Sequence, residues 1–177
     1  HFIAKNQEND IYLTPQKLNP RLAEGSENKM KRAYTRTDDS GVIGYKYLLI
    51  DLDPLQILSD KTIVHRPKGT SASEVEHRAA VDCAWHIVKE IGLRDENYLL
   101  IDSGNGAHIY IPVEWGIQKS AIEAALKGIK TLYDTKLVEV DPTVVNPSRV
   151  MRAPGSMNCK GGIKRPCRYL HCPEHLA

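Results

Sequence analysis

The sequence has no long apolar run. None of its hydrophobic stretches approaches the ~18 residues of a membrane-spanning helix, although hydrophobic residues make up 41% of the 177-residue chain. A chain of this length can bury a substantial core as one domain, or as two small lobes that share a core. We therefore expect a cytoplasmic protein that has no membrane partner.

Aromatic residues are also scarce, with one Phe, two Trp and eight Tyr. Extensive base stacking, as in proteins that coat single strands, is not expected from this content. The net charge of +2 is too small to predict nucleic-acid binding by itself. The distribution of charge is more informative, because between Asp141 and Glu174 the chain has basic residues and no acidic ones.

The chain has four cysteines and no C-x-x-C pair. Three of them gather with two histidines near the end of the sequence: Cys159, Cys167, Cys172, His171 and His175. Without paired ligand spacing, a zinc site is not favoured. We expect reduced thiols, and we expect Cys83 to lie in a helix as a residue of the hydrophobic core.

Two acids follow the apolar run YKYLLI. Asp51 and Asp53 are two residues apart, so on a strand they point to the same face, whereas Leu52 faces the core. A third acid from another strand would complete an oxygen site for Mg²⁺ or Mn²⁺, and Asp141, which follows the run LVEV, is a candidate. Glu139 competes for that role on the same strand face. The alternative is that these are ordinary turn acids before Pro54 and Pro142.

A second candidate segment is IDSGNGAHIY. Its Asn-Gly pair predicts a hairpin turn, formed by Ser103, Gly104, Asn105 and Gly106. We expect this turn to offer backbone N–H groups and the Ser103 hydroxyl to phosphate oxygens. His108 then follows on the second strand as a phosphate donor that titrates near neutrality. The alternative is a hydrogen-bonded histidine beside the core.

The basic segment supplies further candidates. Arg149 and Arg152 are three residues apart, so on a strand they face opposite sides. We expect one to bind triphosphate and the other to brace the acids or reach a template. Gly155, Ser156 and Lys160 lie in a loop of small residues that can approach phosphates closely. A merely solvated basic surface is the alternative.

The order of these motifs resembles the archaeo-eukaryotic primase superfamily, in which a DxD pair, an SGxGxH-like segment and a later single acid form the polymerase centre. The likeness is greatest to the primase-polymerases of plasmids, phages and CRISPR-linked loci. The segments IYLTPQKLNP, EVEHRAA and VDPTVVNPSRVMRAPGSMNCKG are also similar to that group. The resemblance spans roughly residues 10 to 170.

This resemblance implies a template-directed nucleotidyltransferase, a DNA primase or DNA polymerase, that uses two Mg²⁺ or Mn²⁺ ions. Asp51, Asp53 and Asp141 would be catalytic and metal-binding, with His108 on the β- or γ-phosphate and Asn146 also at the nucleotide. The implied partners are a single-stranded DNA template, a primer strand, NTPs or dNTPs, and replication or CRISPR-adaptation proteins. Residues 1–177 would form a single catalytic core excised from a longer protein.

Two other functions stay open at this point. One is a catalytically silent nucleotide-binding module. The other is a DxD metal enzyme acting on a different phosphate substrate, such as a nuclease or a glycosyltransferase. The presence of all three acids argues against the silent module, because such a module need not keep them.

Local patterns predict an alternating chain. Helices are expected from Ser73 to Ile91, with Glu76 completing a capping box and Gly92 ending the helix, and from a second capping box at Ser120 and Glu123. Their apolar stripes are Val75, Ala79, Cys83, Ile87 and Ile91, then Ile122, Leu126, Ile129 and Leu132. Strands are expected at 10–15, 45–51, 98–102, 107–113, 137–140, 149–152 and near Tyr169. Residues 17–34 are expected to be partly helical, and 54–73 to form a loop.

These elements favour an α+β fold with helices on one face of a largely antiparallel sheet. The family resemblance implies more: an RRM-like catalytic lobe, a smaller N-terminal α/β lobe, and an active cleft between them.

Overall fold

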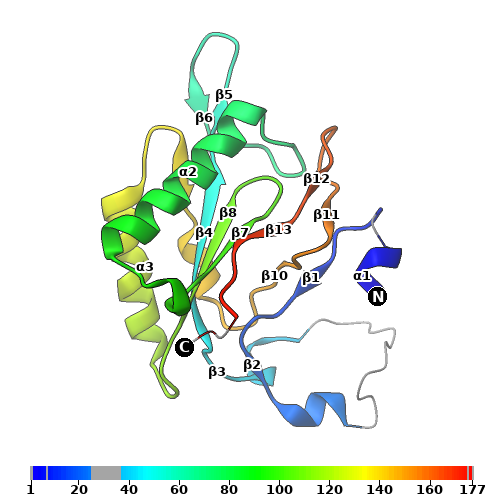
Figure 1. The fold of residues 1–177 in the computed structure, drawn as a ribbon, viewed down its shortest axis with the longest axis vertical. Helices are drawn as coiled ribbons and strands as arrows, with labels where there is room; N and C mark the ends of the chain where they lie inside the picture. Colours follow the sequence, from blue (N-terminus) through cyan, green and yellow to red (C-terminus); the bar gives the residue numbers. More distant parts are fainter. Residues whose placement is uncertain (1, 7, 25–36, 175, 177) are drawn as a thin grey trace.

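The computed structural model describes residues 2–6, 8–24, 37–174 and 176. Its centre is a five-stranded sheet in which every neighbouring pair is antiparallel (Figure 1). In spatial order the strands are β13 (Arg168–His171), β7 (Leu99–Asp102), β8 (Ala107–Pro112), β4 (Tyr47–Pro54) and β9 (Val138–Val140).

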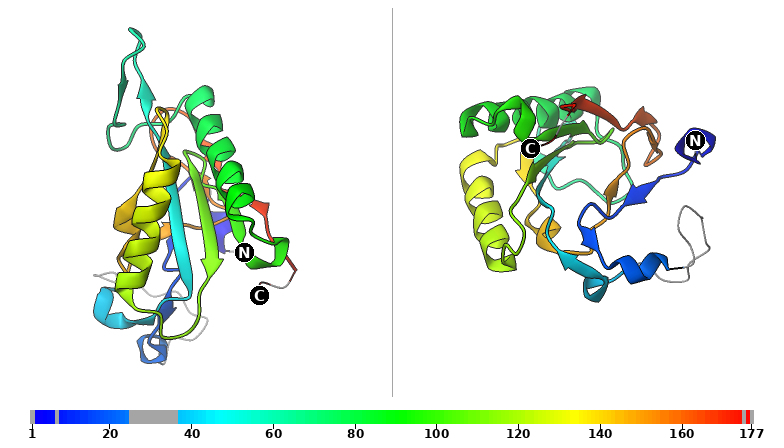
Figure 2. Two further views of the ribbon diagram at one scale, coloured as in Figure 1. Left: turned by 90° about the vertical axis from the view of Figure 1, so that its left-hand side faces the viewer. Right: turned by 60° about the horizontal axis from the view of Figure 1, so that its bottom comes forward.

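Two long helices, α2 (Glu74–Ile91) and α3 (Lys119–Tyr133), cover one face of this sheet. The segments near the N-terminus and the short strands between β9 and β13 lie on the other side (Figure 2). This arrangement confirms the expected α+β fold with a mainly antiparallel sheet. Within the described ranges, no helix is long and apolar enough to cross a membrane.

The remaining elements are short. They are α1 (Phe2–Lys5), β1 (Tyr12–Leu13), β2 (Lys17–Leu18), β3 (Val42–Gly44), β5 (Gln56–Ile57), β6 (Ile63–Val64), β10 (Met151–Arg152), β11 (Met157–Asn158) and β12 (Arg165–Pro166), with 3-10 turns at Pro20–Ala23, Asp39–Gly41, Asp95–Asn97 and Pro142–Val145. β1 pairs with β10, which joins the start of the chain to its basic segment.

Strand β4 runs through the middle of the sheet, between β8 and β9. Ile50 and Leu52 are fully buried toward the helices, as the alternation of the sequence predicts. In the register of the sheet, Asp51 lies opposite His108 and Asp53 opposite Glu139. The acids of β4 and the histidine of β8 therefore share the face that lies away from the helices.

The ends of helix α2 are as expected. Ser73 and Glu76 form the reciprocal capping box, and Gly92 ends the helix with a left-handed φ of 72°. The predicted apolar stripe is partly wrong, because Val75 is 65% and Ile91 41% exposed. The helix instead turns Glu76 inward, and the buried face continues through Ala80, Cys83, Ala84, Ile87 and Val88.

The start of helix α3 corrects another expectation. The N-cap is Gln118, without a capping hydrogen bond from its side chain, so the Ser120–Glu123 capping box is wrong. Both residues lie within the helix, which begins one residue before Ser120. Ile122, Leu126 and Ile129 are buried as predicted, whereas Leu132 is 74% exposed at the last turn.

Two predicted irregular segments contain strands. Residues 54–73 were expected to form a loop, but β4 continues to Pro54, and β5 and β6 then form a small hairpin that projects from the body (Figures 1 and 2). Of residues 17–34, the described part holds a short strand at Lys17–Leu18 and a 3-10 turn at Pro20–Ala23. The rest of that expected helix lies outside the described residues.

Candidate active site

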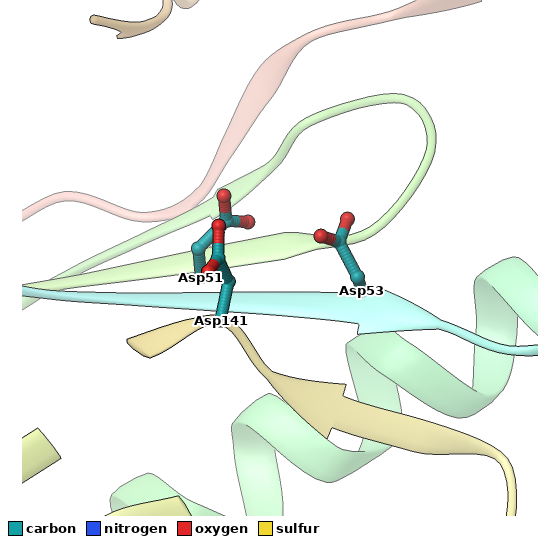
Figure 3. Close-up of side chains that lie close together, drawn as sticks. All are labelled: Asp51, Asp53 and Asp141. Atoms are coloured by element: carbon teal, nitrogen blue, oxygen red, sulfur yellow. The ribbon is translucent and has the colours of Figure 1, made fainter. Parts of the chain in front are cut away.

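Three carboxylates converge on the face of the sheet away from the helices. Asp51 and Asp53 come from β4, and Asp141 directly follows β9 (Figure 3). One carboxylate oxygen from each lies within 4.8 Å of the others. The backbone N–H of Asp141 donates to the carbonyl of Asp51 at 2.9 Å, which fixes the turn beside the strand. The sequence-predicted triad is thus brought together.

The close approach of these acids shifts their ionisation. Burial, followed by the charge of Asp141, raises the pKa of Asp51 to about 6. The charge of Asp51, followed by burial and Asp141, raises the pKa of Asp53 to about 7. The Asp53 side chain is exposed, so solvent screens its repulsion more than that of Asp51. A bound cation would relieve this repulsion and keep all three acids ionised.

Asp141 combines its place in the triad with a turn-capping role. It is the N-cap of the 3-10 turn Pro142–Val145 and accepts hydrogen bonds from the backbone N–H and the hydroxyl of Thr143 at 2.8 and 2.9 Å. Arg149 donates to the same carboxylate at 2.8 Å. The turn-acid alternative and the metal-ligand assignment are therefore compatible, since carboxylates that bind metal are commonly held by such hydrogen bonds.

Glu139, the competitor for the third acid, has other partners. Its carboxylate meets the ring of His65 at 2.9 Å and lies 3.9 Å from the ammonium of Lys130. The cluster with metal-binding geometry among the described residues contains Asp141 instead. Glu139 lies opposite Asp53 in the register of the sheet, but its carboxylate is held by His65, whereas the hydrogen bond from the Asp141 N–H to the Asp51 carbonyl places Asp141 beside Asp51.

His108 lies on β8 beside the acids and is 6% exposed. Its Nε2 is 3.4 Å from an oxygen of Asp51, and its buried Nδ1 has no hydrogen-bond partner among the described residues. Burial lowers the pKa of His108 to about 4, helped by Arg152, Arg149 and Lys160 and opposed by Asp53. The expected titration near neutrality is therefore wrong for the free site, where the ring is neutral above about pH 4.

The hairpin turn is present, but its backbone is already hydrogen-bonded. The N–H of Gly104 donates to Asp102 at 2.8 Å, that of Gly106 to the Ser103 hydroxyl at 3.0 Å, and that of Ser103 to the Gly106 carbonyl at 3.0 Å. The expected cradle of free N–H groups is therefore wrong. The side chains keep donors: the Ser103 hydroxyl proton, and the amide NH₂ of Asn105, whose oxygen accepts from Ala72 at 2.7 Å.

A pocket of about 260 Å³ adjoins the acids. It is lined by Tyr12, Asp51, Asp53, Ser103, Asn105, His108, Arg149, Val150, Met151, Arg152, Asn158 and Lys160. The three candidate segments of the sequence thus contribute residues to the same pocket. Asp51 and Asp53 line it together with basic side chains from the region after β9.

The two arginines differ in their availability. Arg152 is 4% exposed and is bound to Asp10, the Tyr12 hydroxyl and the carbonyl of Met157. Its role is largely to hold β1 against the pocket wall. The Arg149 side chain is 36% exposed and braces Asp141, and Lys160 is exposed at the pocket. The charge of Lys160 lowers the pKa values of both Asp51 and Asp53, which places it near them.

Several predicted nucleotide contacts do not line this pocket. Gly104 packs against Asn158 and Arg165, and Gly106 lies against the carbonyl of Leu52. Both glycines therefore shape the hairpin.

The other predicted nucleotide contacts that do not line the pocket also have structural roles. The Asn146 amide lies against the Asp39 carboxylate. The Gly155 N–H donates to the carbonyl of Cys167 at 2.7 Å, and Ser156, fully buried, donates to that of Ala153 at 2.7 Å. Gly155 and Ser156 form the tight turn between β10 and β11, which leaves Lys160 as the loop's contribution to the pocket.

Sequence analysis missed Tyr12, Asn158 and Asp10. Tyr12 and Asn158 line the pocket, and Asp10 pairs with Arg152 and accepts from the Cys159 backbone N–H at 2.9 Å. The buried Arg152 needs a carboxylate partner, but its burial is not visible in the sequence. Sequence alone does not say that this partner lies near the opposite end of the chain.

The cysteines lie apart from the acids. Cys83 is buried in α2, as expected, and Cys167 is fully buried with its thiol near the carbonyl of Arg152. Cys159 is half-buried and Cys172 exposed. The ring of His171 stacks on Tyr98 with centroids 4.3 Å apart.

Comparison with models of known protein families gives no match to this chain. Comparison with curated protein sequences gives no significant match either.

Proposed function

We propose that this protein is a template-directed nucleotidyltransferase that makes or extends DNA from nucleoside triphosphates. The observation that carries this proposal is the convergence of Asp51, Asp53 and Asp141 beside a pocket with basic side chains. Carboxylates for divalent cations next to cations for phosphate are the two requirements of phosphoryl transfer. The sequence resemblance to primase-polymerases adds the substrate class.

The three acids suit Mg²⁺ or Mn²⁺. All donors are carboxylate oxygens, which these hard cations prefer. The pKa of Asp51 is raised mainly by burial and that of Asp53 mainly by the charge of Asp51, and a bound cation would offset both effects. Two ions bound there would supply charge neutralisation and activation of the attacking hydroxyl. Arg149 and Thr143 would orient Asp141 throughout.

The other side chains would position the nucleotide. Lys160 and the free edge of Arg149 supply positive charge, while Ser103 and Asn105 supply neutral hydrogen-bond donors. His108, neutral at pH 7, donates one hydrogen bond from a buried ring. Such fixed donors contribute by positioning and by stabilising charge in the transition state.

A second pocket of about 340 Å³ also adjoins Asp53. It shares Asp53, Asn105 and Lys160 with the first pocket and adds His65 and Lys68 from the segment after β6. In-line transfer needs the attacking and leaving oxygens on opposite sides of the reacting phosphorus. Within this proposal, the first pocket holds the triphosphate, and the second receives the strand or nucleotide that attacks.

The finer architecture also belongs to this proposal. The sheet with α2 and α3 would be the RRM-like catalytic lobe, and the segments around β1 to β3 would belong to the smaller N-terminal lobe. The pairing of β1 with β10 beside the pocket supports this division, since it brings the early chain to the rim of the site.

The test is incorporation of labelled nucleotides on a single-stranded DNA template, with and without primer, in Mg²⁺ or Mn²⁺. We expect incorporation by the wild type and its loss in Asp141→Asn. Asp82→Asn, which alters an exposed acid of α2, is the matched control and should remain active. Activity without primer would identify a primase.

Other products would decide against the proposal. Cleavage of DNA without incorporation would indicate a nuclease, and sugar transfer would indicate a glycosyltransferase. Nucleotide binding with no reaction under any of these conditions would indicate the silent module.

A further inference from the structure

A separate pocket of about 280 Å³ lies on the sheet face away from the helices, beyond the acids. Its walls include the rings of Tyr47, Tyr110 and Tyr169, from three strands of the central sheet. Pro15 and Pro154 also line it. Only eight tyrosines and one phenylalanine occur in the whole chain, so three rings around one small pocket are a local concentration.

Two of the three rings are in contact. Tyr47 and Tyr110 meet edge to face, with centroids 5.5 Å apart. Tyr169 is 50% exposed, so its ring is accessible to a ligand without any unfolding of the pocket. The half-exposed ring of Tyr169 favours a planar ligand, because stacking removes both apolar surfaces from water.

Tyr110 has a polar requirement that the protein leaves unmet. Its side chain is 3% exposed, and its hydroxyl has no hydrogen-bond partner among the described residues. A buried hydroxyl without a partner is costly. When a ligand with a polar atom enters the pocket, a small movement of the Tyr110 side chain would bring this covered hydroxyl to the ligand and supply the missing hydrogen bond.

A cation lies at the rim. Lys46 is exposed, lines the pocket, and has its ammonium 5.1 Å from the centre of the Tyr47 ring. The described lining includes no carboxylate, in contrast to the pocket beside the acids. The site therefore suits an uncharged planar ring that is joined to an anionic group.

We propose that this pocket binds a nucleobase, with the ring on the tyrosines and the attached phosphate toward Lys46. The choice of a nucleobase over other planar rings rests on the proposed function. The base belongs either to a nucleic-acid strand or to a free nucleotide. Because Tyr110 is two residues from His108 on the same strand face, a base held here lies along the sheet from the acids.

The experiment measures quenching of 2-aminopurine fluorescence with EDTA present, so that it does not depend on metal or catalysis. One probe is 2-aminopurine nucleoside monophosphate, and the other is a short single-stranded DNA with one 2-aminopurine. Quenching of the DNA probe alone identifies a strand site, and equal affinity for both probes identifies a free-nucleotide site. Either result supports the proposal, whereas no saturable quenching of either probe would overturn it.

Variants locate the binding. Tyr169→Ala should weaken affinity about tenfold, as expected for loss of one stacked aromatic ring. The control Trp115→Ala removes another exposed aromatic ring, 63% exposed and outside the pocket, and should bind as the wild type does. Equal affinity in Tyr169→Ala and wild type would overturn the assignment even if the probes bind.

A second pair of variants tests the hydroxyl. Tyr110→Phe should bind several-fold more weakly, while its thermal stability is unchanged or higher, because an unpartnered group is removed. Tyr45→Phe is the control, since its hydroxyl donates to the carbonyl of Val145 at 2.8 Å away from the pocket. Unchanged binding by Tyr110→Phe would exclude a contact between the hydroxyl and the base. If the wild-type protein quenches the probes but incorporates no nucleotide, only the proposed function is contradicted.

Discussion

At the residue scale, burial decides how the histidine of the site behaves. His108 lies among Arg149, Arg152 and Lys160 on one side and the acids on the other, and its low exposure favours the neutral ring. A neutral imidazole donates from one nitrogen and accepts at the other. Because Nδ1 is buried, with no partner among the described residues, contact with a ligand in the pocket falls to Nε2, which lies 3.4 Å from an oxygen of Asp51.

We therefore expect His108→Ala to lose about 1.5–3 kcal/mol of nucleotide binding, the usual worth of one hydrogen bond to a charged group. Titration with a nucleoside triphosphate in Mg²⁺ measures this loss. Because the ring of the free protein is neutral above about pH 4, whereas the pKa values of Asp51 and Asp53 are about 6 and 7, the comparison is made at pH 8, where the ring is neutral and both acids are ionised. His86→Ala, an exposed histidine of α2, is the control. Unchanged affinity in His108→Ala would show that His108 has only a structural role.

A second residue-scale feature is the buried carboxylate of Glu76. It pairs with Arg66 at 2.8 Å and accepts from the backbone N–H of Ile57 at 2.6 Å, besides capping α2. Burial alone would raise the pKa of Glu76, but these bonds and those from Ser73 outweigh it and lower the pKa to about 2. A lowered pKa means that the carboxylate stabilises the fold above its ordinary pKa near 4.5.

Glu76→Ala should cost about 3–5 kcal/mol of unfolding free energy at pH 7, since it leaves Arg66 buried without its partner. The difference from wild type should shrink as pH falls from about 4.5 toward 2, where the wild-type carboxylate takes up a proton. Urea unfolding across this pH range measures the effect. Glu90→Ala, an exposed acid of the same helix, should change little, and an equal loss there would contradict the account.

At the element scale, the β7–β8 hairpin and β4 fit together closely at one glycine. A Cβ built on Gly106 would lie 2.1 Å from the carbonyl oxygen of Leu52, which is backbone and cannot rotate away. Leu52 stands between the two acids of β4. The hairpin turn and the metal-binding acids are therefore coupled through direct backbone contact.

Gly106→Ala should destabilise the fold by about 1–3 kcal/mol, the usual cost of overpacking, and should weaken divalent-cation binding because the end of β4 must move. Thermal unfolding with and without Mn²⁺ measures both effects. Gly128→Ala in α3 is the matched control, since a Cβ there meets nothing within 4 Å. That substitution should be neutral or stabilising. Unchanged stability and cation binding in Gly106→Ala would rule out the coupling.

The central elements and their acids could be predicted from the sequence because their signals are local. The apolar run before Asp51, the Asn-Gly turn and the Ser73–Glu76 capping box each act within a few residues. The predicted apolar stripe of α2 is misplaced because Glu76 is buried in an ion pair with Arg66, which lies ten residues earlier in the chain. Periodicity read from apolar residues alone does not detect a buried acid.

The wall of the site could not be predicted, because it depends on contacts between segments that are distant in the sequence. Arg152 meets Asp10 and Tyr12 only because β1 pairs with β10. The backbone of the hairpin turn was expected to bind phosphate, but Asp102 and Ser103 take its N–H groups. Such competition for hydrogen bonds is set by the folded structure and is not visible in a turn motif.

At the whole-molecule scale, the fold places acids where they repel one another. The pKa values of Asp51 and Asp53 are raised, so between about pH 4 and pH 7 the folded state binds more protons than the unfolded chain. These two groups therefore reduce stability as pH rises through that range. A bound divalent cation acts in the opposite direction, since it requires the ionised carboxylates.

We expect the stabilisation by Mg²⁺ or Mn²⁺, measured as the shift in melting temperature, to be small at pH 5 and to grow toward pH 8. In Asp51→Asn with Asp53→Asn, the metal-free protein should lose less stability between pH 4 and pH 7, and the metal-induced shift should disappear. A metal-induced shift that is independent of pH, or that persists in the double variant, would contradict this linkage.

The central claim is that Asp51, Asp53 and Asp141 together bind divalent cations. Anomalous X-ray diffraction from crystals of the protein grown with Mn²⁺ and a non-hydrolysable nucleoside triphosphate near pH 7.5 tests it most directly. The account predicts anomalous peaks in contact with all three carboxylates, with the triphosphate extending toward Arg149 and Lys160. Manganese bound elsewhere, with these three carboxylates free of it and the triphosphate outside this pocket, would contradict the account.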